Sequence, residues 1–164
     1  MTTSNSCRSR DIIPNRKGVR TPVMWPASFF MNGGCMSTAR IIFEDGTEAR
    51  GLAYGARGTV SGRVVVCSSA TGYEQALRDS AGAIVLVTTP HVGNTGLTGE
   101  GPLTAAGLIA RDPVPRSSSA FAVAELEERL RADGVVGIRE VDTRAIMRRV
   151  RGGTTTLTIV SEEN

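Results

Sequence analysis

With 164 residues, the chain is long enough to bury one hydrophobic core and short for two domains, and its 40% hydrophobic and 21% charged residues are typical of a globular protein. The formal charge of +3 comes from the first 35 residues, which carry +4 and leave −1 for residues 36–164. The domain therefore lacks the basic face that binding to nucleic acid requires. No apolar stretch approaches the ~20 residues of a membrane span, so we expect no membrane contact and a cytoplasmic protein.

Residues 1–36 differ from the rest of the chain. They show no hydrophobic periodicity and contain several internal methionines and the only lysine, Lys17. We expect a disordered extension or an incorrectly assigned start here, with residues 37–164 forming the domain. A signal peptide before a lipid-modified Cys35 is the less favoured alternative, because Pro26 interrupts the apolar segment.

The domain opens with the pattern of a β-hairpin. Apolar and polar residues alternate through 40–44, Asp45 and Gly46 form a dipeptide favoured in tight turns, and a return strand follows over 48–54. Two continuous apolar runs predict central strands buried on both faces, and three further segments are typical of strands. In chain order these five segments are 63–67, 83–87, 106–110, 135–138 and 155–160.

Three segments have the patterns of helices. The first is short and covers 73–78. Ser119 can cap a second helix over 120–132, and Asp142 can cap a third over 143–151. The residues expected to face inward from the two longer helices are Val123, Leu126, Leu130, Ile146 and Val150. Strands and helices together predict a mixed α/β fold that is rich in β-structure.

The residue pattern of an enzyme active site is missing from this domain. His91 is its only histidine, and neither a serine nor Cys67 stands in the glycine-framed turn that a hydrolase nucleophile needs. Cys67 ends an apolar strand and is expected to be a buried, inert thiol. Cysteines and histidine also lack metal-ligand spacing, so we expect no catalytic residue and no metal site.

Two features leave alternatives open. Gly93, Asn94 and Gly96 can form a shaped loop or cradle a phosphate through backbone N–H groups, and the first is favoured because the lysine-bearing loop pattern is missing. The arginines of the last helix form either a solvated face or a contact for a partner or an anion. They are Arg144, Arg148, Arg149 and Arg151.

Five strings carry a family resemblance: EDGT at 44–47, YGARGTVSGRVVV at 54–66, TGYE at 71–74, PHVGNTG at 90–96 and GVVGIREVDTRAIMRRVR at 134–151. In this order they resemble the N-terminal domain of the glutamine-hydrolysing small subunit of carbamoyl-phosphate synthase. The third is similar to the family's TGYQE turn with two residues swapped, the fourth to its PxIGNxG loop, and the last to IxGIDTRxLTRxLR. The motif and interface candidates are Thr71, Gly72, Tyr73, Gly93, Asn94, Gly96, Asp142, Thr143 and Arg144.

The resemblance implies a swivelling β/β/α domain that docks the small subunit onto the synthetase large subunit. In that family a second domain with a Cys-His-Glu set hydrolyses glutamine, and the large subunit uses the released ammonia with bicarbonate, ATP and magnesium. We therefore expect no glutaminase and no cofactor in this chain. The partners implied are the large subunit and a separate glutamine amidotransferase domain, serving arginine or pyrimidine biosynthesis.

Ser80 is the candidate for the family serine that reaches glutamine, although residues 79–83 are shorter than the corresponding family segment. Cys67 stands where the family has an asparagine. We expect a docking and scaffold domain that supports glutamine-dependent formation of carbamoyl phosphate. The alternative is a stand-alone, non-catalytic interaction module or a decayed paralogue.

Overall fold

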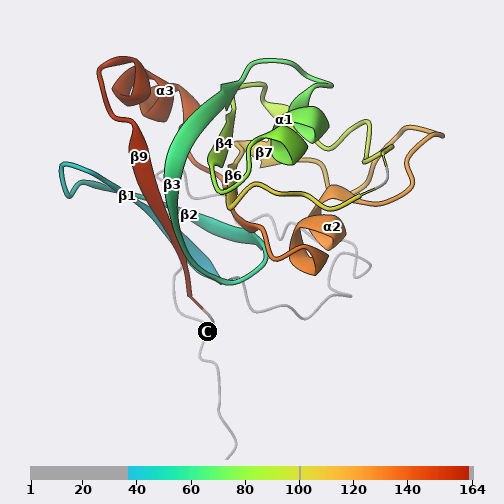
Figure 1. Cartoon of the computed structure of the whole chain (residues 1–164), viewed down its shortest axis with the longest axis horizontal. Coiled ribbons are helices and arrows are strands. Elements are labelled where there is room, and N and C mark those ends of the chain that lie inside the picture. The colour runs from blue at the N-terminus through green and yellow to red at the C-terminus, as the bar shows by residue number, and fades with distance from the viewer. Residues whose placement is uncertain (1–36, 100, 163–164) are drawn as a thin grey trace, which may run out of the picture. The chain divides into compact units, whose positions relative to one another are not determined.

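The main sheet of the domain closes on itself (Figure 1). In the computed structural model, which describes residues 37–99 and 101–162, seven strands form a closed barrel in the order β1-β2-β8-β6-β4-β3-β9. These strands are β1 (Thr38–Phe43), β2 (Glu48–Gly55), β3 (Gly58–Cys67), β4 (Ile84–Val87), β6 (Gly107–Ile109), β8 (Val136–Arg139) and β9 (Thr156–Ser161). β5 (His91–Val92) and β7 (Asp112–Pro113) form a separate two-stranded parallel sheet. The expectation for residues 1–36 lies outside the described part of the chain.

One side of the barrel is antiparallel. The predicted hairpin is confirmed: β1 pairs with β2, and Gly46 takes a φ of +78° in the turn between them. The Asp45 carboxylate accepts the Thr47 N–H at 2.9 Å, which fixes the turn locally. β9 then pairs with β1 on one edge and with β3 on the other. The last strand of the domain therefore closes the barrel and brings both ends of the fold together.

The other side consists of β3, β4, β6 and β8, which are parallel, and it separates two hydrophobic cores. Every residue of β4 is buried, as the sequence predicted for a strand covered on both faces. Ile84 and Leu86 belong to the core inside the barrel, whereas Val85 and Val87 belong to a second core on its outer face. This alternation follows from the strand period of two, because successive side chains point to opposite faces.

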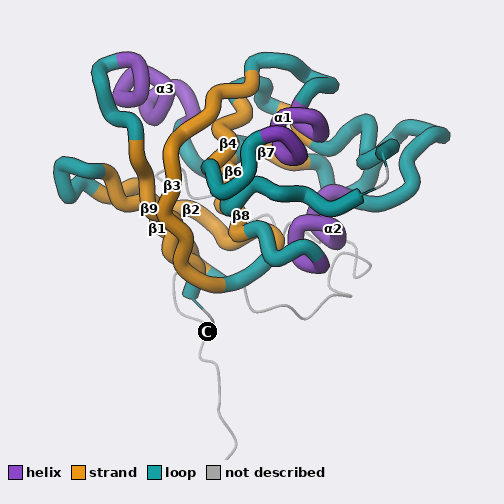
Figure 2. The backbone as a smooth tube through the Cα atoms, viewed as in Figure 1, coloured by secondary structure: helices purple, strands orange, loops and turns teal. Residues whose placement is uncertain are grey.

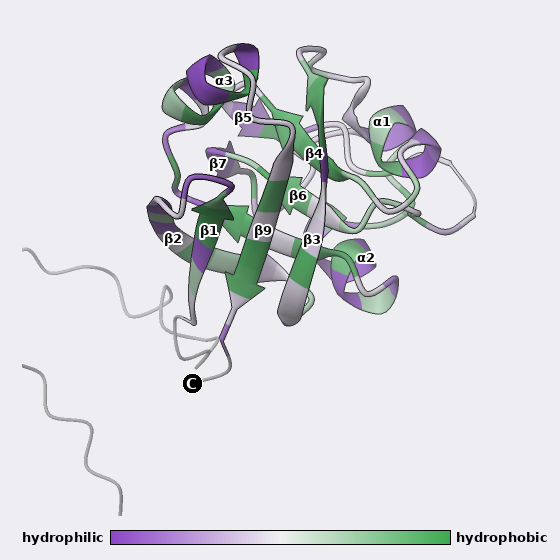
Figure 3. Ribbon diagram, turned by 60° about the vertical axis from the view of Figure 1, so that its left-hand side comes forward, coloured by the Kyte–Doolittle hydropathy of each residue, from purple (hydrophilic) through white to green (hydrophobic). Residues whose placement is uncertain are grey.

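Helices cover the outer core on one side of the barrel (Figure 2). α1 (Tyr73–Asp79) contributes Tyr73 and Leu77 to this core, and α2 (Leu126–Ala132) contributes Leu126 and Leu130. α3 (Thr143–Arg151) lies apart from them and adds Ile146 to the barrel core. Hydrophilic residues mark much of α3 in Figure 3, while green apolar strands lie beside it. All three of these helices are too short and too polar to cross a membrane.

The prediction for α2 was wrong at its start. The helix begins at Leu126 rather than at residue 120, and the Ser119 hydroxyl instead accepts the N–H of Phe121 at 3.2 Å. Val123, expected to face inward, is 77% exposed. The reason is a tertiary contact: the Val123 N–H donates to the carbonyl of Leu97 at 2.8 Å, so this backbone is paired with a distant loop and not with itself.

Two other strand predictions need correction. β3 begins at Gly58 rather than at residue 63, because its first half pairs with β9. The local sequence pattern of these residues does not indicate this pairing. The short β5 and β7 were missed, since two-residue strands leave no periodic signal. The remaining strands and the helices α1 and α3 lie close to their predicted ranges, so the β-rich mixed α/β fold is confirmed. Cys67 is buried at the end of β3, as predicted.

Candidate functional site

Two of the strings that carry the resemblance meet in space at the beginning of α1. The hydroxyl of Tyr73 lies 2.8 Å from Thr95 Oγ1 and donates to the carbonyl of Gly96 at 2.6 Å. The tyrosine ring is fully buried, and burial raises the pKa of its hydroxyl, while the bond to Thr95 opposes this shift. We call residues 71–74, 93–99 and 117–118 the Tyr73 cluster. Its tyrosine connects the helix to the glycine-rich loop.

Glu74 ties the same loop to α1 with three hydrogen bonds and accepts a fourth from Arg78 on its own helix. Its carboxylate accepts the backbone N–H groups of Thr98 at 3.0 Å and Gly99 at 2.7 Å, the Thr98 hydroxyl at 3.1 Å and Arg78 Nη2 at 3.0 Å. Burial alone would raise the pKa of Glu74, but the Thr98 and Gly99 N–H groups and Arg78 outweigh it, so the pKa is lowered. The neighbouring Gln75 side chain, by contrast, donates to Asp79 on its own helix at 2.8 Å. Glu74, which stands where the family's TGYQE string has its glutamine, is therefore the residue that holds the loop.

Glycine conformations and hydrogen bonds between its own residues fix the conformation of the glycine-rich loop. Gly93 and Gly96 have φ angles of +93° and +63°, which side-chain-bearing residues rarely adopt. A Cβ on Gly96 would also overlap the Cβ of Ala122. The Gly96 N–H donates to the Gly93 carbonyl at 2.9 Å, and Asn94 Oδ1 accepts the Ser118 hydroxyl at 2.7 Å. The Gly96 N–H is thus used within the loop and not available to a phosphate, which favours the shaped-loop alternative at this residue.

The remaining candidates near α1 lie at its two ends. Gly72 is the N-cap residue, and its N–H donates to the Ser69 hydroxyl at 3.0 Å. Thr71 is exposed and lines a shallow depression beside Glu74. Ser80 is the C-cap residue at the opposite end of the helix. A seven-residue helix is about 10 Å long, so Ser80 is separated from the Tyr73 cluster.

The last string, residues 134–151, forms β8 and α3, and α3 begins near the carboxyl end of that parallel strand. Asp142 caps this helix by accepting the N–H groups of Arg144 at 3.0 Å and Ala145 at 3.1 Å. The Ala145 bond contributes most to a lowered pKa of the Asp142 carboxyl group, desolvation opposes it, and the Arg144 bond adds to the lowering. Thr143 is 3% exposed and packs inward, whereas Arg144 is exposed. Asp142 is exposed as well, so of these three motif residues only Thr143 is buried.

Two depressions adjoin at this edge. The first, of about 720 Å³, is lined by Arg111, Asp112, Glu140, Val141, Asp142, Arg144 and Arg148. The second, of about 390 Å³, is lined by Ser68, Thr88, Thr143, Arg144, Met147, Arg148 and Arg151. We call the exposed surface of Ser68, Thr88, Arg111, Arg144, Met147, Arg148 and Arg151 the arginine edge. Glu140, at its border, has a φ of +61° and is the only non-glycine residue with positive φ in the described part of the chain.

The arginines of α3 divide into two kinds. Arg149 is exposed but paired within the domain: its Nη1 lies 2.8 Å from Asp45 Oδ2 and 2.6 Å from Thr47 Oγ1, and its guanidinium group stacks 4.6 Å above the Phe43 ring centroid. The guanidinium groups of the arginine edge make no hydrogen bond or ion pair with any described residue. The solvated-face and partner-contact alternatives therefore apply to the edge and no longer to Arg149.

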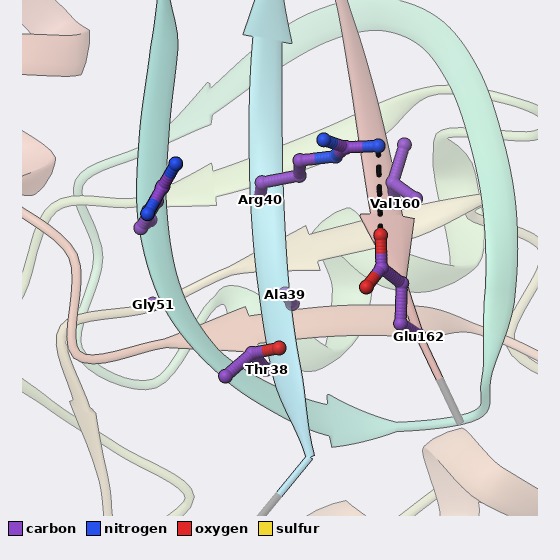
Figure 4. Close-up of a pocket in the computed structure, with 7 residues that line it drawn as sticks. Thr38, Ala39, Arg40, Gly51, Val160 and Glu162 are labelled. Carbon is purple, nitrogen blue, oxygen red and sulfur yellow. Dashed lines mark ion pairs between the residues drawn. The ribbon is translucent and has the colours of Figure 1, made fainter. Parts of the chain in front are cut away.

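A fourth depression lies between β1, β2 and β9 (Figure 4). Arg40 is its most prominent side chain, and it points toward Glu162 at 3.5 Å and lies 3.7 Å from Glu48. Because its charge is already paired twice, this depression presents no free ionic group from Arg40. Among residues 37–99 and 101–162, no three His, Cys, Asp or Glu side chains come close enough to hold a metal ion.

Comparison with known proteins gives the family of this chain. The family model for the carbamoyl-phosphate synthase small chain, CPSase domain, matches residues 41–160. The chain belongs to this family. It is 40% identical over 125 residues to the carbamoyl phosphate synthase small chain of Streptomyces avermitilis, and 42% identical over 122 residues to the chloroplastic small chain of Oryza sativa subsp. japonica. The recognised resemblance is therefore confirmed.

These similarities cover most of this chain and a minor part of its relatives. The Streptomyces alignment covers 73% of this chain and 33% of that protein, and the rice alignment covers 71% and 27%. The chain spans about a third of the length of the curated relatives that it matches. Among solved structures, an aminopeptidase from Aneurinibacillus sp. strain AM-1 overlays on 76% of this chain and 30% of its own, with 18% identity and a TM-score of 0.43. An overlay at that level carries no argument about fold or function.

Sequence reasoning missed part of each site. The loop contacts of Glu74 with Thr98 and Gly99 carried no signal, because helix and loop are more than twenty residues apart. Met147 was also missed, although its position one residue after Ile146 could have placed it at the border of the buried face. Neither omission changes the placement of the candidate residues: those of the TGYE and PHVGNTG strings lie together at α1, and Asp142, Thr143 and Arg144 lie at the start of α3.

Proposed function

We propose that this domain is the N-terminal docking and scaffold domain of a carbamoyl-phosphate synthase small subunit. It would support glutamine-dependent formation of carbamoyl phosphate together with an amidotransferase domain and the large subunit. The observation that carries this proposal is the family match, which runs from β1 to β9 and so covers the barrel. The domain would span residues 37–164 and adopt the swivelling β/β/α fold, for which the closed barrel with α1 and α2 on one outer face is the structural support.

The chemistry would belong to the partners. In this proposal the amidotransferase domain hydrolyses glutamine, the large subunit uses ATP and magnesium, and this domain itself takes no cofactor. Ser80 would be the contact to glutamine, and the Tyr73 cluster would hold the loops beside α1 in the shape that the neighbouring domain requires. The reaction would take place in the cytoplasm and serve arginine or pyrimidine biosynthesis.

A second candidate is a stand-alone, non-catalytic interaction module or a decayed paralogue. The position of Ser80 favours it, because this serine caps the far end of α1 and lies apart from the Tyr73 cluster. Under this alternative the domain would still bind a partner, but it would not support carbamoyl phosphate formation from glutamine.

A reconstitution experiment distinguishes the scaffold function from the stand-alone interaction module. The full chain is mixed with the large subunit and a separately expressed amidotransferase domain of the Streptomyces avermitilis synthase, and carbamoyl phosphate formed from glutamine is measured. We expect activity only when all three proteins are present. An ammonium salt as the nitrogen source is the control for an active large subunit. A normal rate from ammonium with no rate from glutamine would reject the scaffold function and favour the interaction module.

A further inference from the structure

The acidic side chains that border the arginine edge are already engaged within the domain. Glu140 lies 2.9 Å from Arg139, and Asp112 lies 3.5 Å from His91 Nδ1. Asp142 is directed to the first N–H groups of α3. Asp142 interacts electrostatically with Arg148 and Arg111, but no carboxylate forms an ion pair with the arginines that line the two depressions. Four arginines line them against three carboxylates, so this edge carries an excess of positive charge.

This excess is local. Residues 36–164 have a net charge of −1, so the edge is a positive region on a slightly acidic domain. Arg129 and Arg131 of α2, for comparison, are each paired with a carboxylate four residues away, Asp133 at 2.7 Å and Glu127 at 2.8 Å. Unpaired guanidinium groups gathered at one place are the complement of a surface that carries carboxylates.

The surface between the arginines favours a protein segment over a free anion. The second depression is lined by Met147, which is half-buried, and by the aliphatic stems of long arginine side chains. The apolar part of this depression could receive a hydrophobic side chain. A phosphate has no apolar group to place there. A phosphate at the α3 N-terminus would also have to compete with the Asp142 carboxylate for the same N–H groups.

We propose that the arginine edge is a docking surface for an acidic protein segment, one that carries carboxylates on both sides of an apolar side chain. This inference rests on the proposed function to the extent that the segment would belong to the synthetase large subunit. Arg144, Arg148 and Arg151 would pair with the carboxylates, and Met147 would contact the apolar side chain.

Binding to the large subunit tests this with a matched charge reversal. Arg144→Glu, Arg148→Glu and Arg151→Glu are combined in the full chain, and the control combines Arg50→Glu, Arg63→Glu and Arg116→Glu, three exposed arginines without ion pairs to described residues. We expect the edge variant to bind about tenfold more weakly and the control within about twofold of the unchanged chain. Raising the salt from about 0.05 to about 0.3 M should weaken the unchanged chain more than the edge variant. Equal binding by the two charge variants would overturn the proposal and leave the scaffold function intact.

A second measurement does not depend on the large subunit. The isotope-labelled full chain is titrated with a synthetic peptide in which glutamates flank a central leucine pair, and amide shifts are followed by NMR. We expect shifts at residues 68, 88 and 143–151, and none when glutamine replaces glutamate in the peptide. These shifts with no binding to the large subunit would reject the proposed function and retain the acidic-segment chemistry. Shifts caused by inorganic phosphate or a DNA duplex, but not by the peptide, would overturn the proposal.

Discussion

The Tyr73 cluster and the arginine edge use their polar groups in opposite ways. In the cluster, the Tyr73 hydroxyl and the Glu74 carboxylate are both bonded to loop atoms of the same domain. At the edge, Arg144 and Arg148 line two depressions and bond to no described side chain. Both regions come from strings that match one family. The polar groups of the cluster therefore stabilise the fold, whereas Arg144 and Arg148 at the edge are left without ion pairs inside the domain.

The largest expected effect is at Gly96. Gly96→Ala forces a side chain into positive φ and against Ala122, so we expect a loss of about 2–4 kcal/mol in the free energy of unfolding, from backbone strain and overpacking. Gly82→Ala is the control, because Gly82 has a similar φ of +68° but open space where the Cβ would lie. It should lose about 1 kcal/mol. Denaturant unfolding measures both, and equal losses would contradict the close packing of the loop.

Glu74→Gln should be next. The substitution removes a charge that accepts four hydrogen bonds in a partly buried place, and we expect a loss of about 1.5–3 kcal/mol at neutral pH. Glu128→Gln, an exposed carboxylate on α2, is the matched control and should change little. If Glu74→Gln lowered the free energy of unfolding no more than the control does, the hydrogen bonds of Glu74 to the loop would not stabilise the domain.

The same carboxylate gives a pH dependence with a definite sign. Because the folded-state pKa of Glu74 is lowered, its contribution is fully present above its ordinary value of 4.5 and is lost as the pH falls through the lower folded-state pKa. The stability difference between the unchanged chain and Glu74→Gln should therefore shrink steadily below pH 4.5. Unfolding curves at several acidic pH values measure it, and a difference that grows toward low pH would have the wrong sign.

Tyr73→Phe and Tyr54→Phe together test how much the bonded hydroxyl of Tyr73 contributes to stability. Tyr73 loses a bonded hydroxyl, and we expect a cost of about 1 kcal/mol. Tyr54 is 3% exposed, and its hydroxyl has no hydrogen-bond partner among the described residues, so its removal should be neutral or stabilising. Thermal and denaturant unfolding compare the two. A larger loss for Tyr54→Phe would mean that the hydroxyl of Tyr73 does not hold the loop.

The two regions also differ in how far the sequence could predict them. The helix cap at Asp142 and the buried Ile146 follow from local rules, and both were predicted correctly. The bonds of Tyr73 to Gly96 and of Glu74 to Gly99 join segments more than twenty residues apart, and periodicity carries no information about such pairs. The wrong start of α2 has the same cause, because pairing with Leu97 overrode a local helix pattern. Whether an arginine is paired, as Arg149 is, depends on these same tertiary contacts.

The smallest expected effect on stability is at the arginine edge. This measurement tells whether the edge arginines stabilise the fold. Arg144→Ala with Arg148→Ala removes exposed guanidinium groups without internal partners, so we expect the free energy of unfolding to change by less than about 0.5 kcal/mol. Arg149→Ala on the same helix loses contacts with Asp45 and the Phe43 ring, and it should cost more. Denaturant unfolding of both variants decides the matter. If the Arg144 and Arg148 pair proved as costly as Arg149, these side chains would serve the fold, and their charges would not be free for a partner.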